Sequence, residues 1–165
     1  MKNDILLKFG DVKLFLFDLE GVLTHADYPH DKCIELISKA CMEFNQLGLK
    51  FGIVTARKDD DLINKLKAIK DCNILAAAFD KVSAVNEFLK VNSLDYESVF
   101  YIGDDLLDIP LLSRCKVSAA PNSARREVKR VVNFIVKSDK CEDLIQEIIN
   151  TFKNSKEKAG RATKC

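Results

Sequence analysis

The sequence has no excess of charge and no long apolar run, and each absence excludes a class of partner. Its 26 Lys and Arg residues are balanced by 25 Asp and Glu residues, for a formal net charge of +1. Nothing therefore indicates binding to nucleic acid or to an anionic membrane surface. No apolar segment has the length of a signal peptide or of a membrane span, which needs ~20 residues. We expect a cytoplasmic protein that recognises a small molecule.

Cysteine pairs with metal-binding spacing are also missing. The 6 cysteines are widely separated, without a CxxC motif or nearby histidines. This spacing argues against a zinc site and against a disulfide framework. Four of the cysteines are expected to be buried packing residues.

The chain instead contains short apolar runs that alternate with longer segments of helical period. This alternation predicts crossover units that build a mostly parallel sheet with helices on both faces. Strands are expected at residues 12–17, 49–54, 74–79, 98–102, 116–119 and 133–136, and helices at residues 31–47, 60–69, 81–91, 109–113, 124–131 and 141–152. The predicted fold class is α/β, with three layers.

The domain organisation is predicted to be simple. Residues 1–152 are expected to form one domain, because no linker, repeat or large insertion interrupts the alternation. Residues 153–165 are polar and basic and lack an apolar period, so we expect them to form a flexible tail.

Polar residues gather just after four of the predicted strands, where open parallel sheets bind their ligands. They are Asp18 and Glu20 after the first strand, Thr55 and Arg57 with Ala56 between them after the second, Lys81 after the third, and Asp104, Asp105 and Asp108 after the fourth. Clustered carboxylates repel one another unless a cation neutralises them, and hard oxygen ligands suit Mg²⁺. A carboxylate can also attack a phosphoryl group to give an acyl phosphate. The pattern therefore favours a magnesium-dependent phosphoryl-transfer site.

The segments LFLFDLEGVLT, GIVTAR, the single Lys81 and YIGDDLLDIPLL resemble, in this order, the four motifs of the haloacid dehalogenase superfamily. The first and last segments resemble in particular the small capless phosphatases that act on 3-deoxy-D-manno-octulosonate 8-phosphate. The resemblance extends over about residues 12–152. It implies a Rossmann-like fold of three layers without a cap domain.

The resemblance also implies a role for each motif residue. Asp18 would be the nucleophile, Glu20 the general acid and base, and Thr55 and Lys81 would bind the transferring phosphate. Ala56 and Arg57, which follow Thr55, are candidate substrate contacts. The implied ligands of Mg²⁺ are the side chains of Asp18 and Asp104 and the backbone carbonyl of Glu20. Asp105 and Asp108 would orient Lys81 and the metal's water molecules without binding the ion.

Three departures from the family pattern concern the substrate and the assembly. Glu20 stands where the family normally has Asp, and its extra methylene changes the reach of the carboxylate. Residues 24–30 are too few for the β-hairpin through which the family's tetramers assemble. Residues 137–143, KSDKCED, lack the Arg and Gly of the family's substrate-recognition segment.

The sequence leaves three functions open. The leading hypothesis is a phosphatase of a small phosphorylated metabolite, for example a sugar-acid phosphate such as 3-deoxy-D-manno-octulosonate 8-phosphate, acting as a homo-oligomer. The alternative is a catalytically impaired binding or assembly module, because Glu20 replaces Asp. A phosphorelay receiver domain also combines Asp, Thr and Lys, but it carries its phosphoacceptor after the third strand.

Overall fold

The computed structural model of the chain describes residues 3–26 and 28–162. Six strands form one sheet in the order β3-β2-β1-β4-β5-β6, and every neighbouring pair is parallel. The strands are β1 (Leu14–Phe17), β2 (Lys50–Val54), β3 (Cys72–Leu75), β4 (Val99–Ile102), β5 (Val117–Ala120) and β6 (Phe134–Ile135). The predicted strands are present, although β3 ends four residues earlier than expected.

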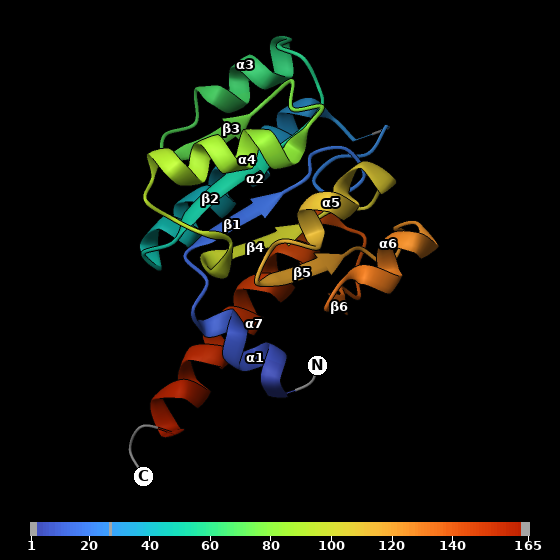
Figure 1. The fold of residues 1–165 in the computed structure, drawn as a ribbon. Coiled ribbons are helices and arrows are strands. Elements are labelled where there is room, and N and C mark those ends of the chain that lie inside the picture. The colour runs from blue at the N-terminus through green and yellow to red at the C-terminus, as the bar shows by residue number, and fades with distance from the viewer. Residues whose placement is uncertain (1–2, 27, 163–165) are drawn as a thin grey trace.

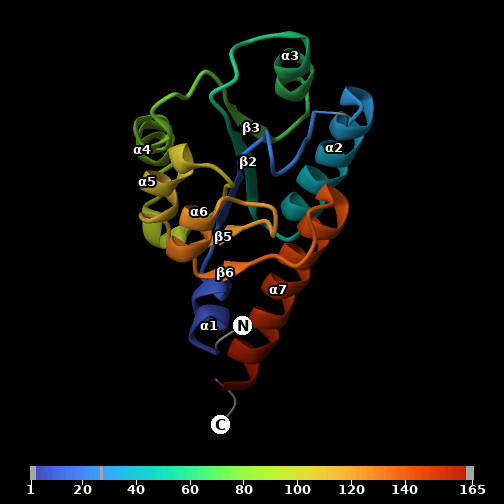
Figure 2. The same ribbon diagram turned by 90° about the vertical axis from the view of Figure 1, so that its right-hand side faces the viewer.

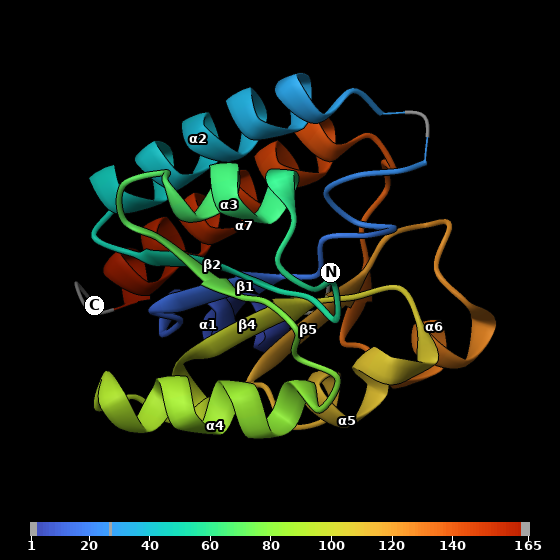
Figure 3. The same ribbon diagram turned by 90° about the horizontal axis from the view of Figure 1, so that it is seen from above.

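Helices cover both faces of the sheet, so the predicted α/β class with three layers is confirmed (Figure 3). One face carries α2 (His30–Gln46), α3 (Asp61–Lys67) and α7 (Cys141–Ala162). The other face carries α4 (Lys81–Val91), α5 (Ile109–Leu112) and α6 (Arg126–Val131). The short 3-10 helices η1 (Tyr96–Ser98) and η2 (Leu106–Asp108) complete the connections around β4.

The central strand shows why the chain folds this way. All four residues of β1 are fully buried. Phe15 and Phe17 pack into the cluster under α2 and α7, whereas Leu14 and Leu16 pack into the cluster under α4 and α5. Because successive side chains of a strand point to opposite faces, a continuous apolar run requires cover on both sides.

The strand order reverses direction between β1 and β4, which creates a crevice at their carboxyl ends. From β1 the chain moves outward through β2 and β3, then returns to the other side of β1 with β4. Ligands bind at such a switch point in doubly wound sheets. The order also excludes the receiver fold, in which the first strand lies between the second and third.

The two ends of the chain differ from the prediction. An unexpected helix, α1 (Asn3–Gly10), lies beside α7 at the lower edge of the molecule (Figures 1 and 2). Residues 153–162 continue α7 instead of forming a flexible tail, and residues 163–165 lie outside the described part. Ser155 is 1% exposed and donates a hydrogen bond to the Leu6 carbonyl. The tail is helical because α1 supplies the partner that the sequence analysis missed.

The connection between β1 and α2 is short, as expected. Apart from Asp27, which is outside the described residues, it contains turns and one isolated bridge between Glu20 and Thr24, and no hairpin. Among the helices that the structure describes, none is both long and apolar enough to cross a membrane.

Candidate active site

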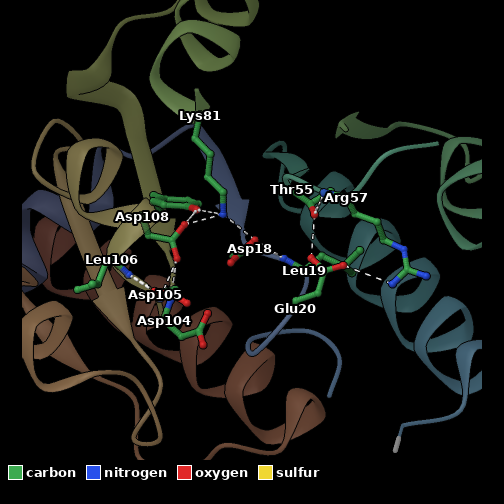
Figure 4. Close-up of polar contacts among 11 residues, drawn as sticks. Asp18, Leu19, Glu20, Thr55, Arg57, Lys81, Asp104, Asp105, Leu106 and Asp108 are labelled. Carbon is green, nitrogen blue, oxygen red and sulfur yellow. Dashed lines mark hydrogen bonds and ion pairs between the residues drawn. The ribbon is translucent and has the colours of Figure 1, made fainter. Parts of the chain in front are cut away.

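The four predicted strand ends meet in one pocket at the switch point of the sheet (Figure 4). The pocket has a volume of about 470 Å³, and every predicted site residue except Thr55 lines it. Thr55 is fully buried behind Glu20, to which it is hydrogen-bonded. A larger hollow of about 790 Å³ lies along α7 and β6 and contains none of these residues.

Lys81 is the buried cation of the site. It is the first residue of α4, and its side chain, 5% exposed, extends between β1 and β4 (Figure 4). Its Nζ lies 2.8 Å from Asp18 Oδ1 and 2.6 Å from Asp108 Oδ1. Burial lowers the pKa of Lys81, but the Asp18 and Asp108 carboxylates outweigh burial and raise it above its ordinary value. Lys81 is therefore charged at neutral pH.

Asp108 organises the loop that follows β4. It is fully buried, and its Oδ2 accepts hydrogen bonds from the backbone N–H groups of Asp104 and Asp105, both at 3.0 Å. Its Oδ1 accepts from Lys81 and, at 2.5 Å, from the hydroxyl of Tyr101. Both carboxylate oxygens are thus occupied by protein donors, which suits a residue that positions others.

Tyr101 is a site residue that the sequence analysis did not identify. It lies on β4, is fully buried, and its hydroxyl also lies 3.3 Å from Lys81 Nζ. A tyrosine in an otherwise apolar buried strand was the available signal, because a buried hydroxyl needs a polar partner.

Glycine permits the close approach of the acidic loops. Gly21 has φ +82, and a Cβ at this position would lie 2.2 Å from Asp104 Oδ2. At Gly103 a Cβ would lie 2.4 Å from Asp108 Cγ. Both positions therefore require glycine, at Gly21 for the left-handed backbone as well.

The pocket concentrates negative charge that the protein alone does not neutralise. Burial, followed by the nearby Asp108 carboxylate, raises the pKa of Asp18 to about 8, although Lys81 opposes the shift. Burial, followed by Asp108 and Asp105, raises the pKa of Asp104 to about 6. Such shifts are expected where several carboxylates are buried together beside a single cation.

The donor set fits a hard divalent cation. Asp18, Asp104 and Asp108 each offer one oxygen within 4.8 Å of the others. Since Asp108 already accepts from protein donors at both oxygens, Asp18 and Asp104 are the side chains better placed to hold an ion. Few protein ligands, all of them oxygen, are typical of Mg²⁺ sites.

Glu20, Thr55 and Arg57 form a second group, in which Glu20 and Arg57 line the pocket and Thr55 is buried behind them (Figure 4). The Thr55 hydroxyl donates to Glu20 Oε2 at 2.8 Å, and Arg57 Nη1 lies 3.4 Å from Glu20 Oε1. Asp105 also lines the pocket, and its Oδ1 accepts from Leu106 N–H and pairs with Arg125 Nε at 3.1 Å. The structure thus brings the predicted residues into two adjoining groups, one buried around Lys81 and one half-exposed around Glu20.

Comparison with known families supports the relationship that the motifs indicated. The profile of a family described as haloacid dehalogenase-like hydrolase matches residues 70–149, which include Lys81 and the acidic cluster after β4. This profile covers just under half of the chain, and over that segment it agrees with the resemblance to the haloacid dehalogenase superfamily.

Similar proteins of this family are phosphatases. The chain is 22% identical over 170 residues to 3-deoxy-D-manno-octulosonate 8-phosphate phosphatase of Yersinia pestis, covering 98% of this chain and 90% of that enzyme. It is 31% identical over 97 residues to phosphoglycolate phosphatase of Picrophilus torridus, covering 53% of this chain but only 40% of that enzyme. These relatives support a phosphoric monoester hydrolase as the class of this chain.

A solved structure shows the same fold. The 3-deoxy-D-manno-octulosonate 8-phosphate phosphatase from Moraxella catarrhalis, in complex with a magnesium ion, a phosphate ion and a KDO molecule, superposes with a TM-score of 0.76. It is 21% identical in sequence, and the alignment covers 100% of both chains. The predicted Rossmann-like architecture without a separate cap domain is consistent with this full-length superposition.

Proposed function

We propose that the chain is a magnesium-dependent phosphatase of a small phosphorylated metabolite, acting through an aspartyl phosphate on Asp18. The observation that carries this proposal is the arrangement of Asp18, Lys81 and Asp104 around one pocket at the switch point of the sheet. A nucleophilic carboxylate, a buried cation and an acidic partner for a metal are the groups that phosphoryl transfer needs.

Asp18 is oriented for attack by two donors. Its Oδ1 accepts from Leu19 N–H at 2.8 Å and contacts Lys81 Nζ at the same distance, while neither donor engages Oδ2. Oδ2 is therefore the oxygen proposed to attack phosphorus. In the first step a bond forms between Oδ2 and phosphorus as the ester P–O bond breaks, and Lys81 stabilises the negative charge that develops on the phosphoryl oxygens.

Glu20 is proposed to move the protons. It lines the same pocket and follows the nucleophile by two residues, so in the first step it protonates the leaving alkoxide. In the second step it accepts a proton from the water molecule that attacks the acyl phosphate, which releases inorganic phosphate and restores Asp18. When bound to Asp18 and Asp104, Mg²⁺ would neutralise charge on the phosphoryl group.

The substrate is proposed to be a phosphorylated sugar or sugar acid. Support comes from the octulosonate phosphatase relatives, which match over most of their length. Two substrate-recognition features of that group are absent here, because the loop after β1 forms no hairpin in its described residues and residues 137–143 lack Arg and Gly. A related phosphate monoester, rather than octulosonate 8-phosphate itself, agrees better with these differences. Oligomerisation and a cytoplasmic location stay predictions.

The alternative is a binding or assembly module with an impaired site. It is favoured by one observation, namely that Thr55 and Arg57 both engage the Glu20 carboxylate in this structure. If these contacts hold Glu20 away from a leaving group, the phosphoenzyme would form slowly or not at all.

Phosphate release from a panel of sugar and sugar-acid phosphates and p-nitrophenyl phosphate tests the proposal. The wild type, Asp18→Asn and Glu20→Asp would be assayed with MgCl₂ and with EDTA. We expect magnesium-dependent turnover that Asp18→Asn abolishes. Turnover only in Glu20→Asp would instead support the impaired module.

A further inference from the structure

The carboxylate of Glu20 is held from both sides. Its Oε2 accepts from the Thr55 hydroxyl at 2.8 Å, and its Oε1 lies 3.4 Å from Arg57 Nη1. Thr55 is fully buried, and its Oγ1 in turn accepts from the backbone N–H of Arg57 at 3.0 Å. Separate partners for the two oxygens fix the orientation of the carboxylate, which a longer side chain such as glutamate would not keep by itself.

Arg57 is held by a further residue. Its Nε lies 2.6 Å from Asp60 Oδ2, and the other oxygen of Asp60 accepts from Ile63 N–H at 2.9 Å as the N-cap of α3. Ile63 is fully buried in the core. A continuous series of contacts therefore runs from the core, through Asp60 and Arg57, to Glu20.

Stability does not explain these contacts. The side chains of Arg57 and Glu20 are 30% and 48% exposed, and ion pairs at such exposure contribute little to folding. The contacts of Asp60 with Arg57 and of Arg57 with Glu20 nevertheless connect α3 to the pocket, which Arg57 and Glu20 line. Their geometry matters more for the placement of Glu20 than for the fold.

We propose that Arg57, held by Asp60, is a positioning residue that sets the Glu20 side chain where its carboxyl group, in the acid form, can give its proton to the leaving group. This inference rests on the proposed phosphatase function. It replaces the expectation that Arg57 is primarily a substrate contact. It also explains how glutamate can serve where a shorter aspartate is usual, because the guanidinium contacts the carboxylate of the longer side chain.

The test compares two leaving groups. p-Nitrophenolate departs without help from an acid, whereas the alkoxide of a sugar phosphate needs a proton, and general acid catalysis contributes about 10²–10⁴-fold. For Arg57→Met we expect kcat/KM on a sugar phosphate to fall by about 10–100-fold, part of that contribution. We expect kcat/KM on p-nitrophenyl phosphate to change by less than about threefold, because kcat/KM reports formation of the phosphoenzyme and p-nitrophenolate leaves without a proton from Glu20. Asp60→Asn, which keeps an N-cap, should show the same pattern more weakly.

Two further variants sharpen the result. In a Glu20→Asp background the shorter side chain is out of reach of Arg57, so Arg57→Met should no longer change the ratio of the two activities. Lys67→Met is the matched control. The Lys67–Asp59 pair is as short as the Arg57–Asp60 pair, at 2.6 Å, and Lys67 lies on α3 without lining the pocket. This control should leave both activities unchanged.

Each other outcome overturns the inference in a recognisable way. Equal losses of kcat/KM on both substrates, or a higher KM at unchanged kcat, would show that Arg57 binds substrate and does not position Glu20. Absence of any turnover in the wild type would reject the proposed function, and this inference with it. Turnover abolished by Asp18→Asn but insensitive to Arg57→Met would reject only the inference.

Discussion

Replacement of Lys81 by methionine should destabilise the protein more than any exposed lysine replacement. Lys81 Nζ contacts Asp18 Oδ1 at 2.8 Å and Asp108 Oδ1 at 2.6 Å, and its side chain is 5% exposed. Loss of one partner from a buried ion pair costs about 3–5 kcal/mol, because the remaining charge is left uncompensated. For a chain of this size each kcal/mol shifts Tm by roughly 2–4 °C. We therefore expect Tm to fall by roughly 6–20 °C.

The pH dependence of this loss has a defined sign. Burial and then Asp108 already raise the pKa of Asp18 to about 8, and Lys81 opposes that rise. Without Lys81 the pKa would rise further. A carboxyl whose pKa is higher in the folded state favours folding at low pH, and this contribution is lost as the pH rises through the folded-state value. The loss caused by Lys81→Met should thus be larger at pH 9 than at pH 6.

The assay is urea unfolding in EDTA, with Lys90→Met as the control. Lys90 lies on the same helix, α4, and is exposed, so its replacement should change the free energy of unfolding by no more than about 0.5 kcal/mol. A loss below about 1 kcal/mol for Lys81→Met would contradict the buried triad, since that is the range of exposed ion pairs.

Three further predictions address the metal, the loops and the end of the chain. The pKa of Asp18 is raised to about 8 and that of Asp104 to about 6, so the metal-free protein loses stability as the pH rises through these values. Saturating MgCl₂ should therefore raise Tm, measured by calorimetry, more at pH 8.5 than at pH 5.5. Gly21→Ala should abolish the stabilisation by Mg²⁺, since its Cβ would lie 2.2 Å from Asp104 Oδ2, whereas Gly48→Ala, at φ +72 with no atom within 4 Å, should retain it. Truncation after residue 152 removes the buried Ser155 and its bond to Leu6, so the free energy of unfolding should fall by about 1–3 kcal/mol, and an unchanged urea midpoint would indicate a dispensable tail.

The sheet and the site were predictable because each depends on a local signal. A strand such as β1, with four consecutive buried apolar residues, can only be covered on both faces. Asp18 and Asp104 lie just after the ends of β1 and β4, Lys81 begins the helix that follows β3, and parallel strands bring their carboxyl ends to one edge. The pocket residues followed from these two rules without any knowledge of side-chain contacts.

What could not be predicted depends on partners far apart in the sequence. The last turns of α7 look polar, and they are helical because Ser155 packs against α1, some 150 residues earlier, where Gly10 allows the close approach. The partners of Tyr101 and Asp60 could not be predicted either, because each depends on which charged group the fold places beside it.

The most direct test of the account is to capture the phosphoryl group on Asp18. The enzyme would be mixed with MgCl₂ and p-nitrophenyl phosphate, quenched in acid within the first turnover, digested and examined by mass spectrometry. The account predicts that the peptide containing Asp18 gains one phosphoryl group, and that neither the Asp18→Asn variant nor a sample in EDTA does so. Phosphate release that persists in Asp18→Asn, with no labelled peptide in the wild type, would contradict it.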